Sequence, residues 1–290
     1  MSDTMLLRKN TGTAETYTGY KVVADNSPEL ISFYSDKTKA INWFDLLENQ
    51  YLMVAGADGE IEDMYKWKNG KHIRVFQKPI ESTELGKIKP MNPQQALAID
   101  ALMDNDTTVK VLTGVSGSGK DFLMAACSFN LICTGYFEKL VWIRNNIEVR
   151  DTNPIGFLKG DFYEKMSVWA APLADHVGGP EMLEDYVARG QIELQHLGHV
   201  RGRDIKRSII YCSEAEHLTR KHVQLLLGRV GEGSILLLNG DWRQIDARAF
   251  EEDNGLRAAV DRLKGNRLFS YVNLPITVRS ETAKLADLLD

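Results

Sequence analysis

The chain has 290 residues, of which 43% are hydrophobic and 26% are charged, and its formal net charge is −5. These values are typical of a globular protein with one large domain or two modest ones. They exclude a protein that binds nucleic acid through overall basic character, so a nucleic-acid site has to be a local patch. The sequence has no apolar stretch of membrane-spanning length, and from its first ten residues we expect no signal peptide. We therefore expect a cytoplasmic protein without a membrane partner.

Residues 1–85 are predicted to form a small β-rich module that ends in a linker. Short strand-like runs alternate with turn signals along this part of the chain, at 20–24, 51–55, 56–59, 68–71 and 72–76. We also predict one helix near 39–49 and a connector over 83–93.

From about residue 86 onward, predicted strands alternate with helical segments. The strands are expected at 109–113, 139–143, 208–212, 235–239 and 271–274. Alternation of this kind implies a parallel sheet with helices on both faces. The sequence therefore predicts a second domain over 86–290, of the α/β class.

A glycine-rich stretch follows the first of these strands and matches the phosphate-binding pattern G-x-x-x-x-G-K-[ST] at every position but the last. In such a loop, backbone amides bind phosphates, the lysine reaches the outer phosphates and the hydroxyl contacts Mg²⁺. The strand before it and the helix-forming run 122–131 after it provide the required setting. A plain glycine-rich turn is the alternative. The residues assigned to the phosphate site are Gly114, Val115, Ser116, Gly117, Ser118, Gly119, Lys120, Asp121 and Phe122.

The last position of the loop holds Asp121 in place of a hydroxyl residue. A second departure follows strand 208–212, where Ser213-Glu214-Ala215-Glu216 has the form of a D-E-A-Q box whose first acid is replaced. Carboxylate and hydroxyl have thus exchanged places, and Mg²⁺ accepts either oxygen. We therefore expect Asp121 and Ser213 to hold Mg²⁺, and Glu214 to activate the attacking water. The alternative is that both positions have lost this chemistry, which leaves a nucleotide-binding or inert protein.

Several further motifs follow in order along the second part of the chain, at 88–95, 155–161, 200–203, 239–246 and 274–281. Together with the glycine-rich loop, they resemble the motifs of the PhoH-like P-loop ATPases, a family related to superfamily 1 helicase cores. The resemblance implies a RecA-like ATPase domain over 86–290, with ATP and Mg²⁺ as cofactors. Residues 1–85 resemble the segment that joins a PIN nuclease domain to the ATPase in the longer subtype. We recognise no PIN domain in this sequence, so no ribonuclease activity is expected.

The resemblance also implies roles for single residues near the nucleotide. Gln95 is expected to read the adenine edge, since an amide both donates and accepts, although helix capping is the alternative. Asp241 and Gln244 follow a strand end, where Gln244 would sense the terminal phosphate; helix capping is the alternative for Asp241. Arg279 would act as an arginine finger, within its own chain or on a neighbour, with a surface salt bridge as the alternative.

Three arginines are candidates for phosphate contacts outside the nucleotide site: Arg144 at a strand end, and Arg201 and Arg203 on either side of a glycine. The planar guanidinium suits phosphate from single-stranded nucleic acid or from a neighbour's nucleotide. A solvated loop is the alternative for Arg201 and Arg203. Members of the family that this chain resembles assemble as rings, so we expect a homo-oligomer, with a hexamer as one such ring.

The leading prediction is an ATP-binding PhoH-like ATPase that couples hydrolysis to remodelling of RNA or another single-stranded nucleic acid. The second prediction is an ATP-binding scaffold without hydrolysis, because Asp121 and Ser213 alter the positions that bind the metal. A kinase-like phosphotransferase is the third, and the helicase-type motifs at 92–95 and 240–244 argue against it.

Overall fold

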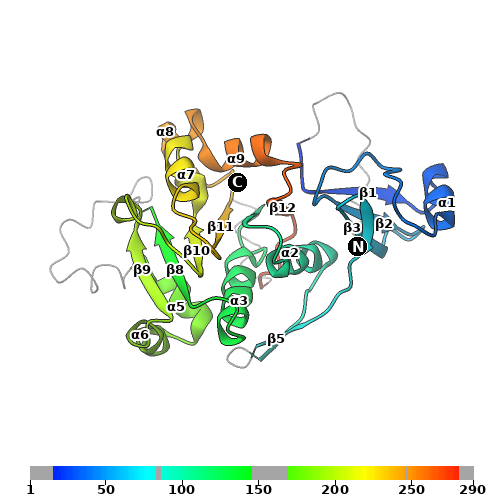
Figure 1. The fold of residues 1–290 in the computed structure, drawn as a ribbon. Coiled ribbons are helices and arrows are strands. Elements are labelled where there is room, and N and C mark those ends of the chain that lie inside the picture. The colour runs from blue at the N-terminus through cyan, green and yellow to red at the C-terminus, as the bar shows by residue number, and fades with distance from the viewer. Residues whose placement is uncertain (1–15, 83–85, 146–168, 246, 281–290) are drawn as a thin grey trace.

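The computed structural model describes residues 16–82, 86–145, 169–245 and 247–280 and contains two main β-sheets (Figure 1). The larger sheet has six parallel strands in the order β12-β7-β11-β10-β8-β9. In chain order these are β7 (Val109–Gly114), β8 (Lys139–Arg144), β9 (Ile192–His196), β10 (Ser208–Ser213), β11 (Ile235–Gly240) and β12 (Phe269–Leu274). This sheet confirms the predicted α/β class, although the sequence pattern misses β9.

Helices cover both faces of the larger sheet. They are α2 (Pro93–Met103), α3 (Lys120–Cys133), α5 (Ala171–Val177), α6 (Pro180–Ala188), α7 (Arg220–Leu227), α8 (Arg248–Glu252) and α9 (Gly255–Leu263), with short 3₁₀ turns η1 (Leu197–His199) and η2 (Ala215–His217). One core joins alternate strand residues such as Tyr211 to α2, α3, α5 and α6, and a second core joins residues such as Cys212 to α7 and α9. Because both faces are buried, the strands are almost continuously apolar. Within the described residues, none of these helices has the length and hydrophobicity required to span a bilayer.

The smaller sheet has four strands in the order β1-β2-β3-β4. They are β1 (Tyr20–Ala24), β2 (Tyr51–Ala55), β3 (Ile61–Lys68) and β4 (Lys71–Arg74), and a separate hairpin joins β5 (Ile80–Ser82) to β6 (Gly86–Ile88). Strands β3 and β4 form the hairpin that the Asn-Gly turn predicts, with Asn69 and Gly70 both at positive φ. The sequence pattern misses β3. Strand β5 lies just before the predicted connector over 83–93, and β6 lies within it.

The predicted helix near 39–49 is wrong, and the helix of this part is α1 (Pro28–Ser35). Lys39, Asp45 and Asn49 have positive φ values of 53, 47 and 63°, which a continuous right-handed helix excludes. A proline in the first turn suits α1, because its fixed φ is already helical.

Helix α2 lies between the two sheets and is shared by both (Figure 1). Tyr51, Met53 and Met64 of the smaller sheet belong to the same buried core as Leu97 and Leu102 of α2. The smaller sheet is therefore packed on the α/β part through apolar contacts.

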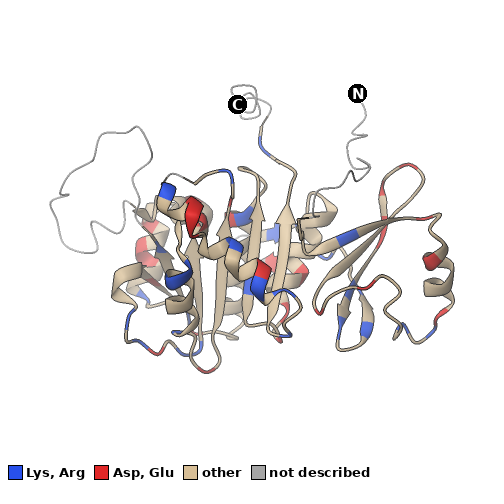
Figure 2. Ribbon diagram, turned by 90° about the horizontal axis from the view of Figure 1, so that it is seen from above, with Lys and Arg blue, Asp and Glu red and all other residues tan. Residues whose placement is uncertain are grey.

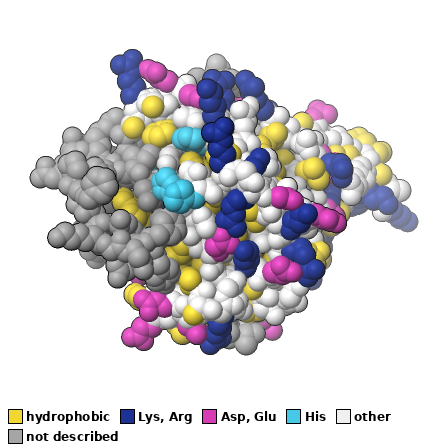
Figure 3. Space-filling model, turned by 60° about the vertical axis from the view of Figure 1, so that its left-hand side comes forward, with side chains coloured by type: hydrophobic (Ala, Val, Ile, Leu, Met, Phe, Trp, Pro, Cys, Tyr) yellow, Lys and Arg dark blue, Asp and Glu magenta, His cyan; other side chains and the backbone are white. Residues whose placement is uncertain are grey.

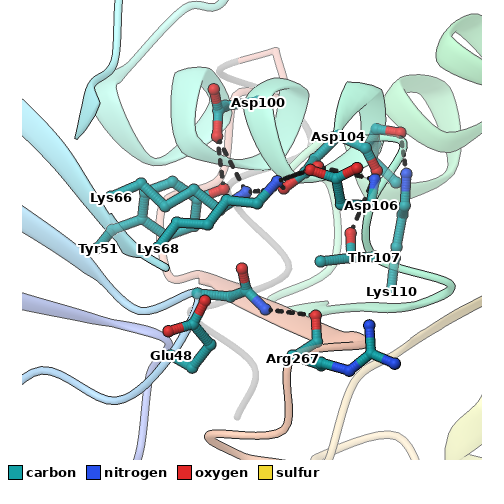
Figure 4. Close-up of polar contacts among 12 residues, drawn as sticks. Glu48, Tyr51, Lys66, Lys68, Asp100, Asp104, Asp106, Thr107, Lys110 and Arg267 are labelled. Atoms are coloured by element: carbon teal, nitrogen blue, oxygen red, sulfur yellow. Dashed lines mark hydrogen bonds and ion pairs between the residues drawn. The ribbon is translucent and has the colours of Figure 1, made fainter. Parts of the chain in front are cut away.

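A polar cluster closes the edge of this junction (Figure 4). Lys66 and Lys68, both from β3, reach Asp104 at the carboxyl end of α2, with Lys68 Nζ 2.7 Å from Asp104 Oδ1. Lys68 Nζ also lies 2.6 Å from Asp106. Burial alone would raise the pKa of Asp104, but the Lys66 charge and the hydrogen bonds from both lysines hold it at about 2.

We predict that Asp104→Asn lowers the free energy of unfolding by about 3 kcal/mol, because it removes the main carboxylate partner of the buried Lys66 ammonium. Urea denaturation at neutral pH measures this loss. Since the folded-state pKa lies below the unfolded value of 3.8, the loss should shrink as the pH falls through about 2. Asp106→Asn is the matched control, because the Asp106 side chain is 74% exposed and its loss should cost little. Equal effects of the two variants would contradict this account of the junction.

Candidate active site

The glycine-rich loop connects β7 to α3, as its sequence pattern predicts. Gly117 and Gly119 have φ values of 72 and 89°, the left-handed region that favours glycine. A Cβ on Gly117 would also lie 2.2 Å from Arg279 Cγ, so a larger residue there would have to displace the Arg279 side chain. The loop therefore exposes its backbone to a phosphate-sized ligand at the start of a 14-residue helix.

Lys120 is the first residue of α3 and folds back over the loop. Its Nζ donates to the carbonyls of Gly114 and Val115 at 2.8 and 3.0 Å, and the residue is 7% exposed. Burial lowers the pKa of Lys120, although the charges of Asp121 and Asp241 oppose that change. A bound phosphate would give the Lys120 ammonium an anionic partner, which is stronger than the two neutral carbonyls that accept from it here.

Asp121 points toward the strands of the larger sheet. Its Oδ1 accepts hydrogen bonds from the Tyr211 hydroxyl at 2.8 Å and from Asn239 Nδ2 at 2.7 Å. Asn239 Oδ1 is buried and has no hydrogen-bond partner among the described residues. Ser213 is 5% exposed at the end of β10, two residues after Tyr211 and on the same face of the strand. Carboxylate, amide carbonyl and hydroxyl oxygens together form a donor set that fits Mg²⁺.

Sequence reasoning gave no site role to Tyr211 or to Asn239, although Asn239 begins the motif at 239–246. Each is a polar group inside an apolar strand, at a position that alternation directs toward α3. That pattern is the signal that would have revealed them.

Glu214 directly follows β10 and has φ 52° and ψ 47°, an uncommon conformation for a residue other than glycine. Its carboxylate forms an ion pair with Arg144 Nη2. Its second oxygen lies 4.0 Å from His217 Nδ1. The structure thus brings together the predicted water-activating residue and an arginine predicted to contact nucleic acid.

Glu216 is a third acid near the loop, and its side chain is almost completely buried. It is 3% exposed, and its Oε2 has no hydrogen-bond partner in the described part of the chain. Burial raises its pKa to about 8, against hydrogen bonds from backbone amides and the nearby Lys120 charge. The raised pKa favours the protonated form of Glu216, which resembles in shape and charge the glutamine that the D-E-A-Q pattern has there.

We predict that Glu216→Gln stabilises the protein at pH 7 by about 2 kcal/mol, because the amide removes the cost of keeping a buried carboxyl protonated. The folded-state pKa lies above the unfolded value of 4.5, so the wild type loses stability as the pH rises from 4.5 to about 8. The gain should consequently vanish below pH 4.5 and reach its maximum near pH 8. Urea denaturation across this range measures it, with exposed Glu60→Gln as the control. A gain that does not depend on pH would contradict the assignment.

Gln95 joins α2 to the loop. Its Nε2 donates to the Ser118 carbonyl at 2.9 Å, and its Oε1 accepts from the Met91 amide at 2.8 Å. The N-cap of α2 is Asn92, whose side chain accepts from the Gln95 amide. The adenine contact of Gln95 stays a prediction, and in this structure its side chain positions the loop.

Arg279 lies against the loop of its own chain, consistent with the close approach of its Cγ to Gly117. The Val278 amide donates to the Gly117 carbonyl at 2.9 Å, so the segment after β12 crosses the loop. Asp241, after β11, is 3% exposed and accepts from the Arg243 amide at 3.0 Å. Gln244 is exposed nearby.

Arg201 and Arg203 follow β9, at the edge of the sheet opposite β12. Arg201 is exposed, whereas Arg203 Nη1 pairs with Glu193, which Lys139 also contacts. The sheet order therefore separates these two arginines from the loop of the same chain. Phe122 is 39% exposed at the start of α3, and its ring lies 6.0 Å from His176. The motif at 155–161 lies outside the described residues.

Basic and acidic residues are interspersed along the ribbon (Figure 2). The face in Figure 3 carries basic side chains through its middle, with acidic ones among them and histidines beside them. On this face, therefore, the basic side chains are mixed with acidic ones.

A glycine-rich loop between a parallel strand and a helix, followed by acids at two neighbouring strand ends, defines a P-loop nucleoside-triphosphate-binding protein. Residues 87–287 match the family model described as PhoH-like protein, and the chain belongs to the PhoH family.

Three relatives show the extent of this likeness. Protein PhoH2 of Bacillus subtilis is 32% identical over 288 residues, which cover 95% of this chain and 65% of the relative. A PhoH-like protein of Synechocystis is 27% identical over 252 residues, which cover 85% of this chain and 72% of that relative. Protein PhoH2 of Mycolicibacterium smegmatis is 29% identical over 205 residues, which cover 70% of this chain and 47% of that relative. The chain thus spans less than two thirds of these two PhoH2 proteins.

Proposed function

We propose that this chain binds ATP with Mg²⁺ and hydrolyses it, and that turnover is coupled to remodelling of single-stranded RNA. The observation that carries the proposal is the contact of Asp121, beside Lys120 at the start of α3, with Tyr211 of β10, the strand that Glu214 directly follows. Family membership supports a nucleoside triphosphate as the ligand.

Each group of site residues has its own proposed chemical role. The loop amides and Lys120 bind and orient the phosphates. Asp121 and Ser213, with Asn239 beside them, would hold Mg²⁺, which neutralises charge on the phosphates when bound. Glu214 would accept the proton of the attacking water, and Arg279, which lies against the loop, would stabilise charge on the outer phosphate.

A scaffold that binds ATP without hydrolysing it is the second candidate, because two catalytic groups are engaged elsewhere. Asp121 Oδ1 accepts from Tyr211 and Asn239, and Glu214 is paired with Arg144. In either case we propose a cytoplasmic homo-oligomer, with a ring that places Arg201 of one subunit near the nucleotide of the next. The position of Arg201 at the sheet edge opposite β12 supports this arrangement.

We predict Mg²⁺-dependent ATP hydrolysis that rises when single-stranded RNA is added. Lys120→Ala should reduce turnover at least about 100-fold, because it removes the charge that orients the outer phosphates. Steady-state phosphate release measures this, and Lys206→Ala, an exposed lysine paired with Asp204, is the control. ATP binding without turnover, abolished by Lys120→Ala, would support the scaffold instead.

The exchange of carboxylate and hydroxyl gives a second prediction. Asp121→Thr and Ser213→Asp should each reduce turnover about 10-fold or more, whereas the double variant should recover most of it. The reason is that each single change leaves the metal with two hydroxyls or two carboxylates, while the double variant restores one of each. Small additive losses would show that the two positions do not form one metal site.

A further inference from the structure

The ion pair between Arg144 and Glu214 joins the ends of two adjacent strands. Arg144 is the last residue of β8, and its register partner in β10 is Ser213, which precedes Glu214. Arg144 Nη2 donates to Glu214 Oε1, and Nη1 donates to the Trp169 carbonyl at 3.3 Å. The Arg144 side chain is 17% exposed and the Glu214 side chain 42% exposed, so solvent reaches the pair.

A second contact links the same two chain segments. Asn145 Nδ2 donates to the His217 carbonyl at 2.7 Å, which ties the residue after β8 to η2. Glu214 lies between these contacts in a left-handed conformation that only the surrounding structure maintains. The placement of its carboxylate therefore depends on the end of β8.

The pair has a chemical consequence for the nucleotide site. A general base must reach the water from which it takes a proton, and a carboxylate oxygen that accepts from a guanidinium is less available for that step. A phosphate is the other strong partner of a guanidinium. A phosphate beside Arg144 would also repel the Glu214 carboxylate, so the two anions compete for one arginine.

We propose that Arg144 is a positioning residue that restrains Glu214, and that a backbone phosphate of single-stranded nucleic acid frees Glu214 by taking over the guanidinium. This inference rests on the proposed function and adds its regulation: the bound nucleic acid activates hydrolysis by breaking the ion pair between Arg144 and Glu214. Because two ligands that compete for one group weaken each other's binding equally, Glu214 must in turn weaken the binding of the nucleic acid.

The first test measures nucleic-acid binding without hydrolysis. The probe is a fluorescein-labelled oligouridylate, added to protein with Mg²⁺ and a non-hydrolysable ATP analogue, and anisotropy reports affinity. Glu214→Gln should bind about fivefold more tightly, because Arg144 no longer has a competing carboxylate. Arg144→Gln should bind about fivefold more weakly with a smaller salt dependence, and the double variant should match it. Unchanged affinity in Glu214→Gln, or no binding by the wild type, would overturn the inference.

The second test measures turnover. Arg144→Gln should hydrolyse ATP without RNA about fivefold faster than the wild type, and RNA should no longer accelerate it. Arg144→Lys keeps a charged partner for Glu214 and should keep part of the RNA response. An RNA-stimulated wild type combined with unchanged or slower basal turnover in Arg144→Gln would overturn the inference and leave the proposed function intact. A wild type that never hydrolyses ATP would reject the proposed function, while the binding test would still decide the inference.

Arg207→Gln is the matched control for both tests. Arg207 Nε pairs with Glu138 at 2.8 Å. Arg207 directly precedes β10 and Glu138 directly precedes β8, so this pair lies at the amino ends of the two strands whose carboxyl ends carry Arg144 and Glu214. This pair is exposed and remote from Glu214, so its loss should change neither affinity nor turnover. A change in this variant equal to that of Arg144→Gln would show that the effect comes from the strands in general.

Discussion

The glycine-rich loop has little freedom of its own, because two other segments hold it: α2, and the end of β12 with the residues that follow it. Gly114 packs against the end of β12, where an added Cβ would lie 2.1 Å from the Leu274 carbonyl oxygen. Gln95 of α2 donates to the Ser118 carbonyl, and Val278 donates to the Gly117 carbonyl. A loop held on all these sides is preorganised for phosphate, so little conformational entropy remains to be lost on binding.

The same loop is connected to the smaller sheet through α2. The amino end of α2 contacts the loop through Gln95, and its carboxyl end is clamped to β3 through Asp104 (Figure 4). The smaller sheet is thus part of the support of the nucleotide site. The same 11-residue helix therefore contacts both the loop and the smaller sheet.

Sequence reasoning succeeds where the determinant is local. Apolar runs predict the central strands, and the spacing of Gly114, Gly119 and Lys120 predicts the loop. It fails where the determinant is the order of strands: the pairing of Arg144 with Glu214 requires β8 beside β10, which no local pattern specifies. The helix predicted at 39–49 fails for a related reason, since tertiary contacts hold this stretch in left-handed turns that composition does not reveal. The roles of the remaining candidate residues stay predictions.

We propose that the carboxylate of Asp121 at the loop makes nucleotide binding depend on Mg²⁺. Asp121 adds negative charge where the phosphates bind, so without a cation it should repel them. The most direct measurement is the affinity for ATP by calorimetry with Mg²⁺ and with EDTA, for the wild type and Asp121→Ser. We expect the affinity of the wild type to fall at least about 10-fold in EDTA, whereas that of Asp121→Ser should fall much less. Equal affinity of the wild type under both conditions would contradict it.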